Sequence, residues 1–203
     1  GQSTMNNCMD PEISRTYKRR LLEDPRSFLD YPVDVVFSLK PTELDDIRLS
    51  LAQRKFSLAK DRIEMVRQLA KQNQITTVDG FNDLLPLFYN QETFKSYPQT
   101  WLEAGNYERL TKWLGKLCAT DLSAVDTSSC ALIEDWIHAL KEQSSVDLMI
   151  SASGDGKAAF LPRTRDEWST FQRVTYWGFQ SSMKGLDGES LSLRPGIDKV
   201  PLI

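Results

Sequence analysis

The spacing of apolar residues changes near Ser144, and this change constrains the fold more than any other feature of the sequence. Residues 146–150 and 158–161 are short apolar runs bounded by turn residues, a pattern typical of buried strands. A loop rich in serine and glycine joins the two runs. Thr164 and Glu167 then form an S/T-x-x-E capping box, which predicts the start of a helix. The sequence therefore predicts the order strand, loop, strand, helix.

Helical spacing dominates the chain before this point. The apolar residues after Thr42 predict one long amphipathic helix from about Thr42 to about Gln72. Asn106 is expected to cap a second helix. A third helix is expected over about residues 130–142, with Ile133, Trp136, Ile137 and Leu140 facing inward. We therefore predict an α/β fold class in which a predominantly helical N-terminal region is followed by the start of a mixed sheet. The expected parts are an N-terminal arm over 1–40, a helical region over 41–145 and an α/β segment over 146–203.

Charge and cysteine content exclude several classes of protein. The 25 basic and 28 acidic residues give a formal charge of −3, which argues against strong electrostatic binding to nucleic acid or to an anionic membrane. Cys8, Cys118 and Cys130 have no C-x-x-C spacing, so we expect a reducing compartment and neither a disulfide framework nor a zinc ribbon. The apolar runs are too short to span a bilayer, and the N-terminus shows no signal-peptide core. We therefore expect a cytoplasmic chain.

The loop between the expected strands is the segment whose residue types point most directly to chemistry. Small residues let the backbone approach a ligand closely, and successive N–H groups can cradle phosphate oxygens. Serine hydroxyls add hydrogen-bond donors, and a lysine adds positive charge. The candidate nucleotide-phosphate-binding residues are Ser151, Ser153, Gly154, Asp155, Gly156 and Lys157. A plain hairpin turn is the competing interpretation, and spacing alone favours it.

Better-known sites fit the sequence less well. The P-loop motif G-x-x-x-x-G-K-S/T needs a wider glycine spacing, and it needs a hydroxyl where Ala158 stands. Gly154, Gly156 and Ala159 match the dinucleotide motif G-x-G-x-x-A, but the predicted helix begins too late for it.

His138 is the only histidine, and we expect it on a solvated helix surface. We predict no metal site, because adjacent carboxylates on a helix point in different directions.

Five stretches of the sequence, taken together with the Ser/Gly loop, resemble a known protein family. They are Phe94-Lys95-Ser96-Tyr97-Pro98, Arg109-Leu110-Thr111-Lys112-Trp113-Leu114, Thr120-Asp121-Leu122-Ser123, Lys157-Ala158-Ala159-Phe160-Leu161-Pro162-Arg163 and Arg165-Asp166-Glu167-Trp168. Together with the Ser/Gly loop, these stretches resemble adenylate-forming enzymes. The chain is similar to acyl-protein synthetases of the bacterial bioluminescence type and to phenylacetate-CoA ligase-like proteins. The resemblance covers most of residues 42–183, and the loop is its most specific element.

The resemblance implies a two-step reaction. A carboxylic acid attacks the α-phosphate of ATP with Mg²⁺ present, and the acyl adenylate then passes to a thiol. The acceptor thiol belongs to CoA, to a carrier protein or to a protein cysteine. In this scheme the loop holds the β- and γ-phosphates as pyrophosphate leaves, which suits glycines and hydroxyl donors that stabilise developing charge.

The loop also departs from the family pattern Ser-Gly-Thr-Thr-Gly-Lys. Residues 153–157 read Ser-Gly-Asp-Gly-Lys, and Asp155 puts negative charge beside the expected phosphates unless Mg²⁺ or Lys157 offsets it. The family's adenine-binding motif, ribose-binding aspartate and C-terminal catalytic lysine are expected beyond Ile203. Two hypotheses follow. The chain is either the N-terminal segment of an acyl-activating ligase, inactive without a further C-terminal region or a protein partner, or a non-catalytic docking module derived from that fold.

Overall fold

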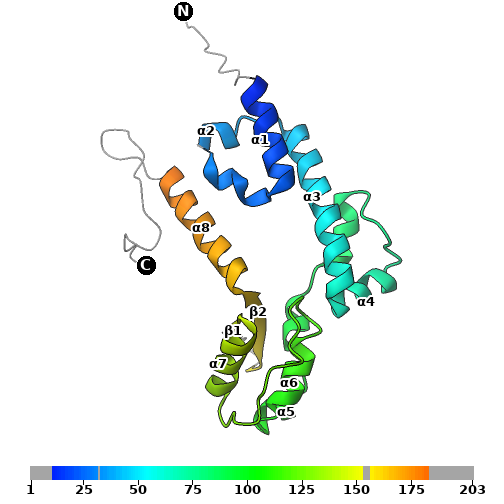
Figure 1. The fold of residues 1–203 in the computed structure, drawn as a ribbon. Coiled ribbons are helices and arrows are strands. Elements are labelled where there is room, and N and C mark those ends of the chain that lie inside the picture. Colours follow the sequence, from blue (N-terminus) through cyan, green and yellow to red (C-terminus); the bar gives the residue numbers. More distant parts are fainter. Residues whose placement is uncertain (1–10, 32, 153–155, 183–203) are drawn as a thin grey trace, which may run out of the picture. The chain divides into compact units, whose positions relative to one another are not determined.

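The computed structural model describes residues 11–31, 33–152 and 156–182. The described part is mainly helical and carries one antiparallel pair of strands (Figure 1). This order agrees with a general α/β class. In chain order the elements are α1 Pro11–Glu23, η1 Pro25–Asp30, α2 Val33–Val36, α3 Pro41–Arg62, α4 Glu64–Gln72, η2 Phe81–Leu87, η3 Gln91–Lys95, α5 Gln99–Glu103, α6 Tyr107–Leu114, α7 Ile133–Ser144, β1 Val146–Ala152, β2 Ala158–Thr164 and α8 Arg165–Ser182, where η marks a 3₁₀-helix.

The long helix expected from Thr42 to Gln72 is wrong, because the chain forms two helices, α3 and α4. The break lies at Ile63, whose φ of −112° and ψ of 115° are extended rather than helical. The Arg67 guanidinium from α4 donates to two carbonyl oxygens in the last turn of α3, at 3.2 and 3.4 Å. Such a side-chain bond satisfies carbonyls that the end of a helix leaves without partners.

Side-chain caps fix the starts of the later helices. The Asn106 side chain accepts a hydrogen bond from the Arg109 amide at 3.2 Å, which confirms the predicted cap of α6. The predicted capping box of α8 is confirmed as well. The Thr164 amide donates to Glu167 at 2.9 Å, and the Glu167 amide donates to the Thr164 hydroxyl at 3.1 Å.

The chain forms two compact units, Gly1–Leu51 with Ser169–Ile203, and Ala52–Trp168. In the first unit, Tyr17 of α1 packs with buried residues of α1, of α3 and of the segment between α2 and α3. The buried members of this core are Tyr17, Leu21, Leu39 and Ile47. The basic residues Arg15, Arg19 and Arg20 are exposed, so this cluster forms a solvated face of α1.

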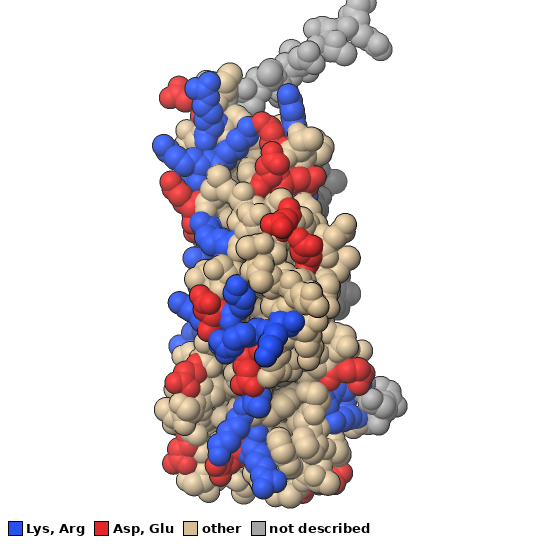
Figure 2. Space-filling model, turned by 90° about the vertical axis from the view of Figure 1, so that its right-hand side faces the viewer, with Lys and Arg blue, Asp and Glu red and all other residues tan. Residues whose placement is uncertain are grey.

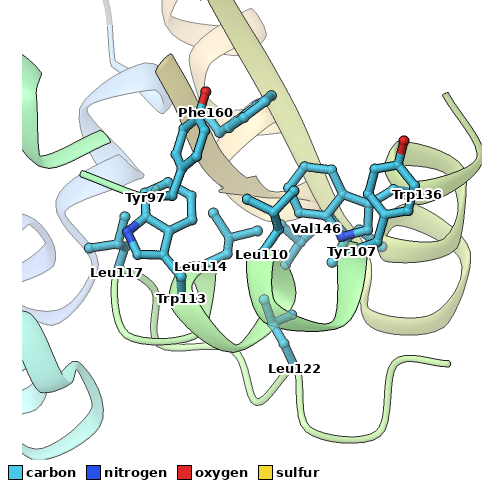
Figure 3. Packing of buried hydrophobic residues seen from close by; sticks show 11 residues of the cluster. Tyr97, Tyr107, Leu110, Trp113, Leu114, Leu117, Leu122, Trp136, Val146 and Phe160 are labelled. Atoms are coloured by element: carbon cyan, nitrogen blue, oxygen red, sulfur yellow. The ribbon is translucent and has the colours of Figure 1, made fainter. Parts of the chain in front are cut away.

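The second unit has the larger aromatic core, centred on α6, α7 and β2 (Figure 3). Trp136 of α7 is fully buried, stacks on Tyr107 at a centroid distance of 5.9 Å and meets Phe160 edge-on at 5.4 Å. Its indole N–H donates to the Thr111 hydroxyl at 2.8 Å, so the polar atom of this buried ring has a partner. The predicted inward face of α7 is confirmed at Trp136 and Leu140.

The two strands form an antiparallel hairpin, with α7 packed against β1 (Figure 1). The register pairs Val146 with Thr164 at the open end and Ala152 with Ala158 beside the loop. Val146 is buried, but Met149 and Ile150 are 41% and 46% exposed. The expectation that the whole of 146–150 is a buried strand is therefore wrong at Met149 and Ile150.

Charged side chains of both signs are interspersed on the face drawn in Figure 2. This distribution agrees with the small formal charge of −3. None of the helices in the described ranges is long and apolar enough to cross a membrane.

Candidate functional site

The β1–β2 hairpin determines where the Ser/Gly loop lies. Ser151 pairs with Ala159 and Ala152 pairs with Ala158, so the loop connects two neighbouring strand ends. The Ser151 side chain is exposed. Ser153, Gly154 and Asp155 lie outside the described residues. The structure therefore brings Ser151, Gly156 and Lys157 to one end of the hairpin.

Gly156 is required by its backbone conformation and not by lack of space. Its φ is +78°, in the left-handed region that L-residues with a side chain rarely adopt. A Cβ at this position would meet no atom within 4 Å. The residue is exposed, so its backbone is open to a ligand as well as to water.

Lys157 lies directly before β2 and contacts Tyr97. Its Nζ donates to the Tyr97 carbonyl oxygen at 2.6 Å. The same ammonium lies 4.7 Å from the centroid of the Tyr97 ring, a distance typical of a cation–π contact. These two contacts hold the charged end of Lys157 beside the loop and restrict its rotamers.

Tyr97 anchors this arrangement in the core of the second unit (Figure 3). It is fully buried, and its ring lies 5.0 Å from that of Trp113 and 5.2 Å from that of Phe160. Its hydroxyl donates to the Ala158 carbonyl oxygen at 2.7 Å. Burial raises the pKa of the Tyr97 hydroxyl above its ordinary value, so it stays a neutral donor at physiological pH.

Lys95 is a second lysine in the segment that packs on the hairpin. It ends η3, which lies against β2, and its side chain is only 5% exposed. Its Nζ forms an ion pair with Glu92 at 3.2 Å, whereas the Glu92 side chain is 75% exposed. Buried lysines are uncommon because removing an ammonium from water costs free energy.

Sequence reasoning found the loop but not the residues that support it. The 94–98 stretch was matched only as part of a helical region, with no role for Lys95 or Tyr97. The hydrogen bond between the Lys157 ammonium and the Tyr97 carbonyl oxygen spans 60 positions, and no local spacing pattern predicts so distant a contact. The available signal is a lysine placed between aromatic residues, which argues for burial of its carbon chain.

A separate cavity of about 920 Å³ lies in the second unit. It is bounded by α6, the start of α4 and the segment that follows α6. Lys112 and Lys116 line it, but Lys112 pairs with Glu108 at 2.6 Å and Lys116 with Glu64 at 3.5 Å. None of the described loop residues is among its lining residues. The cavity is therefore not the phosphate site that the sequence predicts.

Other residues considered for chemistry occupy ordinary positions. His138 is exposed on α7, which confirms the prediction of a surface histidine. Cys118 and Cys130 are free thiols, and burial raises the pKa of each, which disfavours the reactive thiolate. Cys8 lies outside the described residues. Within the described ranges, no three His, Cys, Asp or Glu side chains are grouped so as to hold a metal ion.

Comparisons of the chain with protein-family models, with curated proteins and with solved structures find no match.

Proposed function

We propose that this chain is the N-terminal, phosphate-binding segment of an ATP-dependent ligase. The ligase activates a carboxylic acid as its acyl adenylate and then transfers the acyl group to a thiol of CoA, a carrier protein or a protein cysteine. The chain contributes the grip on the β- and γ-phosphates, and a further C-terminal region or a protein partner supplies the remaining catalytic groups.

One observation carries the proposal. Two of the stretches that resemble adenylate-forming enzymes, 94–98 and 157–163, contact each other directly. Tyr97 of the first stretch accepts from the Lys157 ammonium and donates to the Ala158 carbonyl oxygen of the second. Residues that resemble a family at distant positions and also meet in space support a shared role.

The described loop residues fit a phosphate ligand. Lys157 supplies a positioned positive charge, Gly156 an open backbone and Ser151 an exposed hydroxyl. All three lie at the same end of the hairpin. Magnesium bound with ATP neutralises phosphate charge and takes most of its ligands from phosphate oxygens and water. In this proposal the residues of the chain orient the pyrophosphate and stabilise its charge as it leaves.

Isothermal titration calorimetry with magnesium-ATP tests the proposal. The wild-type chain is expected to bind, and Lys157→Ala is expected to weaken binding about tenfold or more, because a charge-assisted hydrogen bond is lost. Lys112→Ala is a matched control, since this exposed lysine lies on α6 with Glu108 as its partner. Absence of any binding by a correctly folded wild-type chain overturns the proposal. Carboxylate-dependent exchange of pyrophosphate into ATP, assayed with the natural protein, then tests the reaction.

The docking module is the second candidate, and one observation favours it. The Lys157 ammonium is bonded to the Tyr97 carbonyl oxygen, which gives it a structural role without any ligand. In a loop that no longer binds a ligand, this hydrogen bond to Tyr97 would give Lys157 a purely structural role. The same titration separates the candidates, because a docking module gives no heat with ATP and Lys157→Ala then changes stability alone.

A further inference from the structure

The β1–β2 hairpin has two outer edges, one along each strand. In the described part of the chain the sheet consists of these two strands alone, so each strand has one edge that its neighbour does not cover. Such an edge presents a row of backbone N–H and C=O groups that a further strand can bind. The two edges of this hairpin differ in what already occupies them.

The outer edge of β2 is largely occupied. The Ala158 carbonyl oxygen accepts from the Tyr97 hydroxyl at one end of the strand. The Thr164 amide donates to the Glu167 carboxylate at the other end. Between them stands Pro162, which has no N–H to offer, and η3 packs against the same strand. A further strand therefore finds few backbone groups to bind along β2.

The outer edge of β1 is open. In an antiparallel pair, alternate residues turn their backbone groups toward the neighbouring strand, and the residues between them turn theirs away. The Arg165 amide donates to the Ser145 carbonyl oxygen across the hairpin at 3.2 Å, so Ser145 and every second residue after it face β2. The backbone groups of Leu148 and Ile150 therefore face away from β2. They have no hydrogen-bond partner among the described residues.

Apolar side chains flank this open edge on both faces of the sheet. Met149 and Ile150 are both exposed, and neighbouring residues of a strand point to opposite faces. An exposed strand edge of this kind is a site at which another strand pairs. The segment that fits it is an extended strand with apolar side chains on both of its own faces.

β1 itself meets this requirement. Consider two copies paired antiparallel along β1, with Met149 opposite Met149 of the second copy. Leu148 then lies opposite Ile150 of the second copy, so apolar side chains meet apolar side chains. Asp147, the one charged residue of β1, lies opposite a serine and not opposite a second carboxylate. Its charge is also balanced within its own copy by Lys141, at 3.1 Å.

We propose that β1 is a dimerisation edge, along which two copies of the chain pair antiparallel about a two-fold axis at Met149. The result is a four-stranded sheet in the order β2-β1-β1-β2, in which both copies contribute the same surface. The backbone of Met149 faces β2, so the two Met149 residues form a pair without mutual hydrogen bonds, in which side chains approach most closely. This interaction surface goes beyond the proposed function and needs no nucleotide.

Size-exclusion chromatography with light scattering tests the proposal. The wild-type chain is expected to have twice its monomer mass of 23.2 kDa. Met149→Lys and Met149→Glu are each expected to weaken the dimer about tenfold or more, because two like charges then oppose each other in place of two apolar side chains. An equimolar mixture of the two variants is expected to recover a dimer, since opposite charges now face each other. Leu85→Lys is the control, because it places a charge at another exposed apolar residue of the same unit.

Three results would overturn the dimerisation edge. A folded wild-type chain that stays monomeric shows that a second copy is not the occupant. A dimer that Met149→Lys does not weaken uses a different surface. Folded single variants that do not regain a dimer when mixed contradict the two-fold axis at Met149. Circular dichroism checks the fold of each variant, and these measurements contain no ATP, so their outcome is independent of the proposed function.

Discussion

The hydroxyl of Tyr97 donates a hydrogen bond to the carbonyl oxygen of Ala158, 61 positions further along the chain, at 2.7 Å. The carbonyl oxygen of the same tyrosine binds Lys157. Tyr97 thus joins the helical part of the second unit to the first residues of β2 through both its side chain and its backbone. Tyr97 therefore holds the loop end of the hairpin, at Lys157 and Ala158, against the helical part of this unit.

Tyr97→Phe is expected to lower the free energy of unfolding by about 1–2 kcal/mol, because the Ala158 carbonyl oxygen loses this hydrogen bond in a partly buried place. Denaturant titration followed by tryptophan fluorescence measures the change, since Trp113 contacts the Tyr97 ring. Tyr31→Phe is the control, because its hydroxyl lies 3.5 Å from Arg20 in an exposed place. Equal losses in the two variants would contradict a specific role for the Tyr97 hydroxyl.

Thr164→Ala is expected to cost about 1 kcal/mol of stability, because it removes the hydroxyl that accepts from the Glu167 amide at the start of α8. Thr164→Ser keeps that hydroxyl and serves as the matched control. Circular dichroism during thermal unfolding reports the loss of helix. A Thr164→Ser variant as unstable as Thr164→Ala would show that the methyl group, and not the cap, matters here.

Substitution of two glycines by alanine is expected to change stability in opposite directions. Gly156→Ala forces a side chain into a φ of +78° and is expected to cost about 1–2 kcal/mol. Gly178→Ala lies within α8, where a Cβ meets nothing within 4 Å, and it is expected to add about 0.5–1 kcal/mol. Chemical denaturation of both variants measures the two signs. A neutral Gly156→Ala would mean that the solution conformation at this residue differs from the left-handed one.

The sequence predicted those features of the fold that depend on neighbouring residues. The caps at Asn106 and Thr164 follow from residue type and spacing within one helical turn, and the structure confirms both. The order of strands, loop and helix was likewise predicted from local pattern. The caps depend on hydrogen bonds that span only three positions. Each strand corresponds to one short apolar run in the sequence.

The errors have physical causes of a different kind. Ile63 breaks a helix without proline or glycine, because bonds from Arg67 satisfy the end of α3 and nothing in the local spacing signals this. Ile150 was expected to be buried but is 46% exposed. A short apolar run indicates a strand, but it does not indicate how much of that strand other elements cover. The pairing of Lys157 with Tyr97 depends on how distant segments pack, so only the loop half of the candidate site was predictable.

Tyr89 is a buried phenol whose ionisation should destabilise the protein at high pH. Its hydroxyl oxygen is buried, and no hydrogen-bond partner for it occurs among the described residues. Burial, and to a lesser degree the nearby Cys118, raises its pKa to about 12. An unfolded tyrosine has a pKa of about 10, so above that pH the unfolded chain releases its proton first.

The stability contribution of Tyr89 is therefore complete below about pH 10 and is lost as the pH rises toward about 12. Tyr89→Phe removes the titrating group, so this variant should lose less stability than wild type over that range. At neutral pH the variant is expected to be as stable as wild type or slightly more stable, because a buried unpaired hydroxyl costs free energy in the folded state. Urea midpoints measured from about pH 9 to about pH 12 test both statements. Parallel curves for the two proteins would contradict a buried, unpaired Tyr89, since the phenol would then titrate alike in the folded and unfolded states.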